Sequence, residues 1–197
     1  MGVYEIKSFG HKEPWIDLQV AAYDELQRNG GADGFIFDPM SHVFTSDSGL
    51  KIPSTTTILR EEGLTPDYFL VDPYYKDRGR IIHKCTELCD KGDLDEYTVD
   101  PEVMPYLDAY ITFKLDWHGK ITNVEERRYH PVYFYAGIID RIIEGNKSYI
   151  LYLKPGKKPP YELKLMENLR GSLNVFLSAL NVHTWKTNNM KGEASGD

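Results

Sequence analysis

The sequence predicts an α/β (α+β) fold in which helices pack against a sheet. Short segments alternate apolar and polar residues with the period of a β-strand, and longer segments repeat apolar residues with the period of an α-helix. With 41% hydrophobic and 13% aromatic residues, a chain of 197 residues can bury one ordinary core. We therefore expect one domain over residues 1–197.

The N-terminal part of the chain predicts a strand, a helix and then a hairpin. Residues 3–8 have the composition of a short strand, and apolar residues recur at helical spacing over 15–28 until Asn29-Gly30-Gly31 ends the helix. Residues 35–45 are typical of a hairpin. Ser54 or a following threonine is the candidate cap of a short helix.

The rest of the chain predicts helices and strands that share one sheet. The predicted helices cover 77–91, 101–117 and 174–186. The predicted strands are a meander over 121–129, 134–143 and 149–153, with a further strand at 161–165. We expect a flexible tail over 187–197.

Charge and hydropathy limit the possible partners. A net charge of −7 gives no global attraction to nucleic acid, so contact with DNA needs a local basic groove or metal ions; an acidic surface that serves only solubility is the alternative. No apolar run approaches the roughly 20 residues of a membrane span. We expect a soluble, cytoplasmic protein with no membrane contact.

The two cysteines predict neither a disulfide framework nor a metal cluster. Cys85 and Cys89 lie one helical turn apart, which suits neighbouring positions on one helix face. We expect reduced, structural thiols. Two thiols are too few for a four-thiolate iron–sulfur cluster, so we expect none.

Charged residues in two apolar segments are the candidates for chemistry. Glu5 and Lys7 are two residues apart, so a strand would present their carboxylate and ammonium groups on one face. Glu-x-Lys alone is common and indicates a solvated strand face in most proteins. Asp140, however, lies among isoleucines, where a carboxylate needs a partner or a metal ion.

The pattern of these residues resembles the PD-(D/E)XK nucleases of the RecB type, most closely their small phage-encoded exonuclease-like members. The matching segments are Phe35-Ile36-Phe37-Asp38-Pro39 with His42, Ile52-Pro53-Ser54-Thr55-Thr56, Arg78-Gly79-Arg80-Ile81-Ile82-His83 with Glu87, Val124-Glu125, and Tyr135-Ala136-Gly137-Ile138-Ile139-Asp140. In that family the aspartate strand is followed by a D/E-x-K strand and a helix with glutamine and tyrosine. Here that block precedes the rest of the chain.

The resemblance implies a restriction-endonuclease-like central mixed sheet, flanked by helices, with a rearranged strand order. The catalytic strand and helix would be relocated to residues 1–31. The implied ligands of Mg²⁺ or Mn²⁺ are His83, Asp140 and Glu5. The implied catalytic residues are Asp140, Glu5, Lys7, Gln19, Tyr23 and Glu125.

Several of these residues also have a structural interpretation that involves no catalysis. His83 could be a satisfied helix histidine, and Glu125 could form a surface ion pair with the following arginines. His83-x-x-x-Glu87 lacks the second histidine of a zinc protease. Several aromatic residues could stack on bases, although aromatic residues at strand spacing are more often core; they are Phe35, Tyr74, Tyr75, Tyr133 and Tyr135.

The resemblance implies a metal-dependent DNA nuclease, exonuclease-like, that acts on DNA ends or single strands in bacterial or phage DNA recombination or processing. It predicts that residues 3–8 pair beside residues 137–142. The alternative is an inactive nuclease-fold module that binds DNA or protein; the Asp140 strand would then pair directly with residues 149–153. A homo-oligomer in which Glu5 and Lys7 complete a neighbouring subunit's site is a third possibility.

Overall fold

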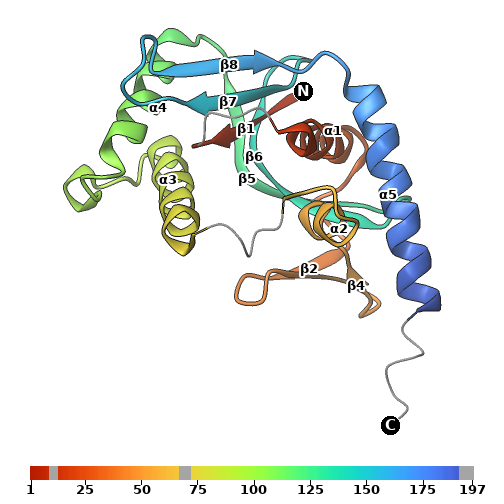
Figure 1. Cartoon of the computed structure of the whole chain (residues 1–197). Helices are drawn as coiled ribbons and strands as arrows, with labels where there is room; N and C mark the ends of the chain where they lie inside the picture. The colour runs from red at the N-terminus through yellow and green to blue at the C-terminus, as the bar shows by residue number, and fades with distance from the viewer. Residues whose placement is uncertain (9–12, 67–71, 191–197) are drawn as a thin grey trace. The chain divides into compact units, whose positions relative to one another are not determined.

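The computed structural model (Figure 1) describes residues 1–8, 13–66 and 72–190. The chain divides into two compact units. The first unit contains residues 1–12, 69–127 and 138–167. The second contains residues 13–68, 128–137 and 168–197. Both units are built from separate stretches of chain. The single-domain expectation stays a prediction.

A mixed sheet forms the centre of the first unit. Among the described residues it has five strands in the order β5-β6-β1-β7-β8. Their bounds are β1 (Gly2–Lys7), β5 (Ile121–His130), β6 (Tyr135–Ile143), β7 (Tyr149–Leu153) and β8 (Tyr161–Leu165). The ends of β5 and β6 continue into the second unit. Mixed α+β architecture is therefore confirmed.

The N-terminal strand β1 occupies the middle of this sheet. It pairs antiparallel with β6, where Val3 faces Ile142, and parallel with β7, where Glu5 faces Ile150. All six of its residues are buried, as expected for a strand with neighbours on both sides. The predicted pairing beside residues 137–142 is confirmed. The predicted three-strand meander is wrong, because β1 lies between β6 and β7.

Two helices of the first unit start and end at strong local signals. Helix α3 (Pro73–Lys91) begins after Asp72, whose carboxylate accepts the Tyr74 N–H at 2.9 Å, and ends at Gly92 with a left-handed φ of 75°. Helix α4 (Met104–Asp116) follows a 3₁₀ turn η2 (Glu96–Thr98). Helix α3 starts earlier than predicted because Asp72-Pro73 is a cap and first-turn signal. Within the described residues no helix is long and apolar enough to cross a membrane.

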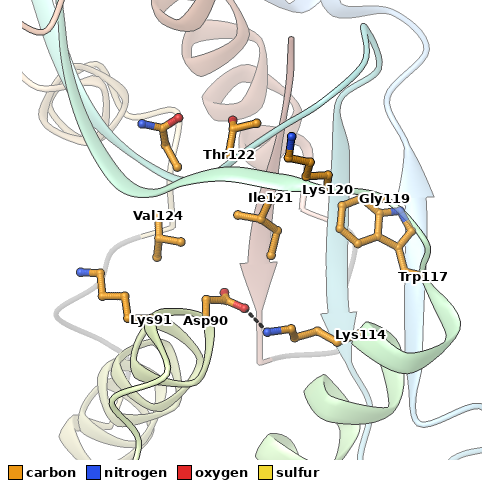
Figure 2. A pocket seen from close by; sticks show the side chains of 10 residues that line it. Asp90, Lys91, Lys114, Trp117, Gly119, Lys120, Ile121, Thr122 and Val124 are labelled. Atoms are coloured by element: carbon orange, nitrogen blue, oxygen red, sulfur yellow. Dashed lines mark hydrogen bonds and ion pairs between the residues drawn. The ribbon is translucent and has the colours of Figure 1, made fainter.

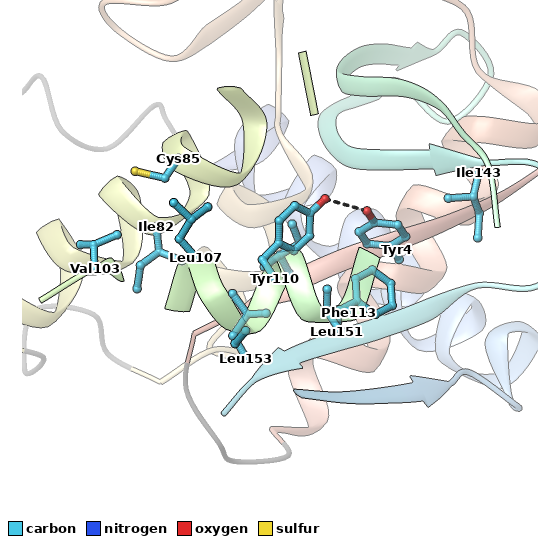
Figure 3. Packing of buried hydrophobic residues seen from close by; sticks show 12 residues of the cluster. Tyr4, Ile82, Cys85, Val103, Leu107, Tyr110, Phe113, Ile143, Leu151 and Leu153 are labelled. Carbon is cyan, nitrogen blue, oxygen red and sulfur yellow. Dashed lines mark hydrogen bonds between the residues drawn. The ribbon is translucent and has the colours of Figure 1, made fainter. Parts of the chain in front are cut away.

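The core of the first unit lies between these helices and the sheet (Figure 3). Tyr4 and Phe113 meet edge to face at 5.9 Å between ring centroids, and the Tyr4 and Tyr110 hydroxyls lie 3.0 Å apart. Other members of this core are Ile6, Ile82, Cys85, Leu107, Leu151 and Leu153. Cys85 and Cys89 carry free thiols. The side of β1 that carries Tyr4 and Ile6 is thus used for packing.

The second unit combines helices with a small antiparallel sheet. Helix α1 (Pro14–Asn29) packs on α5 (Leu169–Asn189), and α2 (Thr55–Glu61) contacts both. The small sheet has the order β2 (Phe35–Asp38), β3 (Val43–Ser46) and β4 (Lys51–Ile52). The predicted hairpin is therefore confirmed, and Ser54 caps α2 by accepting the Thr57 N–H at 3.1 Å. Residues 191–197 of the predicted tail lie outside the described residues.

Candidate metal centre

Strands β1 and β6 change their mode of contact at Glu5 and Asp140. Their paired register runs from Gly2–Ile143 to Tyr4–Arg141. At the next positions side chains replace the backbone ladder: the Ile6 N–H donates to Asp140 Oδ2 at 2.9 Å, and the Asp140 N–H donates to Glu5 Oε1 at 3.4 Å. Each carboxylate therefore satisfies a buried N–H of the other strand.

Three side chains from different elements of the first unit converge beside this point. His83 comes from α3, Glu125 from β5 and Asp140 from β6, and one ligand atom of each lies within 4.8 Å of the others. His83 Nδ1 is 3.5 Å from Asp140 Oδ2. An imidazole with two carboxylates is a suitable donor set for Mn²⁺ or Mg²⁺. We refer to these three candidate ligands, His83, Glu125 and Asp140, as the metal centre.

Glu125 has an unusual backbone conformation within strand β5. Its φ is 52°, in the left-handed region, which a residue other than glycine adopts at a cost of about 1–3 kcal/mol. This conformation interrupts the regular alternation of side chains along the strand. Arg141 Nη1 lies 3.3 Å from Glu125 Oε1 and helps to hold the side chain. Strain of this kind is concentrated at functional sites.

Burial and mutual repulsion shift the titration of this region. Burial, then the charge of Asp140, raises the pKa of Glu125 to about 8. The same two causes, in the same order, raise the pKa of Glu5 well above its usual range, against the opposing effect of Lys7. Burial lowers the pKa of His83, although Asp140 opposes that shift. Without a metal ion, this region therefore favours protonated Glu5 and Glu125 and a neutral His83 imidazole. A neutral imidazole is the form that binds metal, whereas the carboxyl groups must lose their protons to do so.

Lys7 lies on the same face of β1 as Glu5, as the spacing predicts. Its Nζ is 3.6 Å from Glu5 Oε2, and the residue is 7% exposed. Such a buried ammonium is a strong local source of positive charge. Glu5 thus connects two groups: it accepts the Asp140 N–H with one oxygen and faces Lys7 with the other.

Arg141 is a buried residue that the sequence reasoning missed. It is fully buried; its Nε lies 2.5 Å from Asp90 Oδ2 and its Nη2 lies 3.3 Å from Thr86 Oγ1. Asp90 also pairs with Lys114 at 2.7 Å. We call Arg141, Asp90, Thr86 and Lys114 the Arg141 network. Its signal was present, because an arginine beside Asp140 in an apolar strand also needs partners.

A pocket of about 590 Å³ lies at the Lys114 end of this network (Figure 2). Asp90 and Lys91 of α3, Lys114 of α4 and residues 119–124 contribute to its lining, with Trp117. Lys91 is paired with Glu87 at 2.6 Å, and Lys114 is paired with Asp90. Carboxylates therefore neutralise these two lysines, and Lys120 is a third lysine of the lining.

The predicted substrate-orienting pair belongs to the second unit. Gln19 and Tyr23 lie one turn apart on α1, and Gln19 Nε2 donates to the Tyr23 hydroxyl at 3.2 Å. The Tyr23 ring lies against Gly137 of β6, where a Cβ would come within 2.6 Å of Cε1. Gly137 is thus required by a close approach. The orienting role of this pair stays a prediction.

Other residues considered from the sequence have structural partners. Glu87 pairs with Lys84 at 2.9 Å as well as with Lys91. Tyr135 is fully buried and donates a hydrogen bond to the Ala22 carbonyl, so the core reading holds for it.

Comparison of the chain with protein-family models, with curated proteins and with solved structures finds no match. The functional argument therefore depends on the geometry of the site.

Proposed function

We propose that this protein is a Mg²⁺- or Mn²⁺-dependent nuclease that hydrolyses phosphodiester bonds in DNA. The observation that carries the proposal is the meeting of Glu5 and Asp140, which are 135 residues apart, at the point where β1 and β6 stop pairing. A carboxylate on each strand, with Lys7 beside Glu5, is an arrangement that a metal ion and a scissile phosphate require.

The residues of the metal centre fit a divalent ion. His83, Glu125 and Asp140 would hold it, because their ligand atoms are already gathered. Burial, and then the negative charge of Asp140, raises the pKa of Glu125 to about 8. A cation offsets that charge, so its binding displaces protons. When bound, the ion polarises a phosphoryl oxygen and makes a coordinated water more acidic.

Lys7 has the position of a charge-stabilising group. Its ammonium is buried and held beside Glu5, so it needs little reorganisation when negative charge develops on a phosphate. Glu5 fixes both Lys7 and the backbone of Asp140. We therefore assign Glu5 a positioning role: it holds the Lys7 ammonium and the metal ligand Asp140 in fixed positions relative to each other.

The other two hypotheses lose their structural motivation. The inactive module was expected to pair the Asp140 strand directly with residues 149–153, whereas Lys7 of β1 faces Tyr152 there. Completion by a partner subunit was invoked to bring Glu5 to Asp140, and both residues already meet within one chain. An exonuclease-like role in bacterial or phage DNA processing, on DNA ends or single strands, remains part of the proposal.

The test is the digestion of single- and double-stranded DNA with Mn²⁺ or Mg²⁺ by the natural protein and by Asp140→Asn. We expect the substitution to lower the rate on the order of 10³-fold, because it weakens the metal site. Asp93→Asn, the same change at an exposed aspartate, is the matched control and should have no effect.

Calorimetry with Mn²⁺ gives an independent reading of the same site. The natural protein should bind the ion and release protons near neutral pH, and Asp140→Asn should bind it more weakly. A folded protein that neither binds Mn²⁺ nor degrades any DNA would sink the proposal.

A further inference from the structure

A second cluster in the first unit has a different composition. The guanidinium carbon of Arg78 lies 5.5 Å from the ring centroid of Tyr74, 5.1 Å from that of Tyr75 and 5.3 Å from that of Tyr106. Tyr74, Tyr75 and Arg78 come from the first turns of α3, and Tyr106 comes from α4. We call these residues the tyrosine cluster.

The two tyrosines of α3 are exposed yet held in place. Tyr74 is 47% exposed and Tyr75 is 54% exposed. Their rings meet edge to face with centroids 5.2 Å apart, and the Tyr74 hydroxyl donates a hydrogen bond to Glu102. Because these rings are already ordered before a ligand binds, the loss of side-chain entropy on binding is smaller. Core packing does not explain aromatic rings that remain half exposed.

The helix segment that carries the cluster is basic, in contrast to the whole chain. Residues 72–84 contain four lysines and arginines and two aspartates, whereas the chain has a net charge of −7. The guanidinium of Arg78 lies over the rings and carries the positive charge that a phosphate requires. Aromatic rings with adjacent positive charge are the elements of a single-stranded nucleic-acid surface.

We propose that the tyrosine cluster binds single-stranded DNA, with unpaired bases stacked on Tyr74 and Tyr75 and a backbone phosphate beside Arg78. The inference deepens the proposed nuclease function and rests on it for its biological meaning. Bases in a duplex have their faces covered by neighbours, so exposed tyrosine rings select unpaired bases.

The position of the cluster suits a strand that also reaches the metal centre. Tyr75 and His83 lie on the same helix, eight residues apart, which corresponds to a rise of about 12 Å. Stacked nucleotides advance about 3.4 Å each along one strand, so a segment of roughly four nucleotides spans this rise. We therefore infer that the substrate is single-stranded DNA.

The test is the affinity for oligothymidylate, measured by fluorescence anisotropy without divalent ions so that no cleavage occurs. Tyr75→Leu removes the aromatic face and should weaken binding roughly 5- to 150-fold, while Tyr75→Trp should retain it. Tyr97→Leu is the matched control, because Tyr97 is a fully exposed tyrosine of the same unit, and it should change nothing. Duplex DNA of equal length should show no loss with Tyr75→Leu.

Unchanged oligothymidylate affinity in Tyr75→Leu would overturn the inference, as would an equal loss for duplex DNA or in Tyr97→Leu. Hydrolysis of a small phosphodiester, bis(p-nitrophenyl) phosphate, separates this result from the nuclease proposal. The small ester has no nucleotide chain to bind along the cluster, so its hydrolysis by the natural protein reports on the metal centre alone. If the natural protein hydrolyses neither the ester nor DNA, the nuclease proposal fails, and the binding data still decide the role of the cluster.

Discussion

Two adjacent residues of β6, Asp140 and Arg141, anchor two clusters of buried charge that differ in balance. In the Arg141 network, Asp90 accepts from both Arg141 and Lys114, and opposite charges meet at 2.5 and 2.7 Å. In the metal centre, burial and then the repulsion of Asp140 raise the pKa of Glu125 to about 8. A buried carboxylate that meets cations on both sides indicates a structural role, whereas a buried surplus of carboxylates indicates a site for a cation.

Removing the positive charge at the centre of the network should have the largest effect on stability. Arg141→Met removes one of the two cations that the buried Asp90 carboxylate contacts and leaves Lys114 as the other, so we expect a loss of about 3 kcal/mol in the free energy of unfolding. Urea denaturation measures it. The double variant Arg141→Met/Asp90→Leu should recover part of the loss, because it also removes the buried carboxylate; the Lys114 side chain, which is 33% exposed, then loses its partner. A single variant as stable as the natural protein would mean that Arg141 does not stabilise the network.

The metal centre should respond to pH in the opposite sense to an ordinary salt bridge. The pKa of Glu125 is raised from about 4.5 to about 8, so the metal-free folded protein holds an extra proton between these values. Its stability should therefore fall as pH rises from about 5 to 8, on the order of 2 kcal/mol after allowance for the 29% exposure of the side chain.

Glu125→Gln provides the control for this pH dependence. The glutamine cannot titrate, so the unfolding free energy of the variant should fall less steeply with pH than that of the natural protein. The difference between the two unfolding free energies, followed against pH, gives the contribution of Glu125. His83 has a lowered pKa and contributes a slope of opposite sign, which is present in both proteins and cancels in the difference. Equal slopes in the two proteins would contradict the assignment. Saturating Mn²⁺ should also flatten the slope of the natural protein.

The smallest effect is expected where ion pairs are partly solvated. Glu87 pairs with Lys84 and Lys91, whose side chains are 59% and 41% exposed. Glu87→Gln should change the free energy of unfolding by about 1 kcal/mol or less, and less again in high salt. A loss comparable to that of Arg141→Met would show that burial does not separate the two kinds of ion pair.

Local chemistry made the elements predictable, and the resemblance supplied the pairing of β1 with β6. The Ser54 cap and the apolar periodicity of α1 are local signals, so both were found. The predicted pairing of β6 with β7 is wrong. Strands that follow one another along the chain usually pair, but here the distant strand β1 lies between these two.

The composition of the site was only partly visible in the sequence. Asp140 is recognisable as a candidate because it lies among isoleucines, where a charged group needs a partner. The same reasoning applies to Arg141. Its partner Asp90 lies 51 residues away on a helix, and only the folded register of α3 brings the two together. The left-handed backbone of Glu125 has no sequence signal of its own, since glutamate rarely adopts it.

The insertion of β1 between β6 and β7 also orders the folding of the chain. Strand β1 is synthesised first, yet both of its neighbours are formed from residues 135–153. Until those residues emerge, β1 has no partner strand, and β6 and β7 can pair with each other in a hairpin that excludes it. The contacts between Glu5 and Asp140 form only when β1 has entered that slot. The assembly of this contact is thus a late event in folding, and the finished sheet is the condition for it.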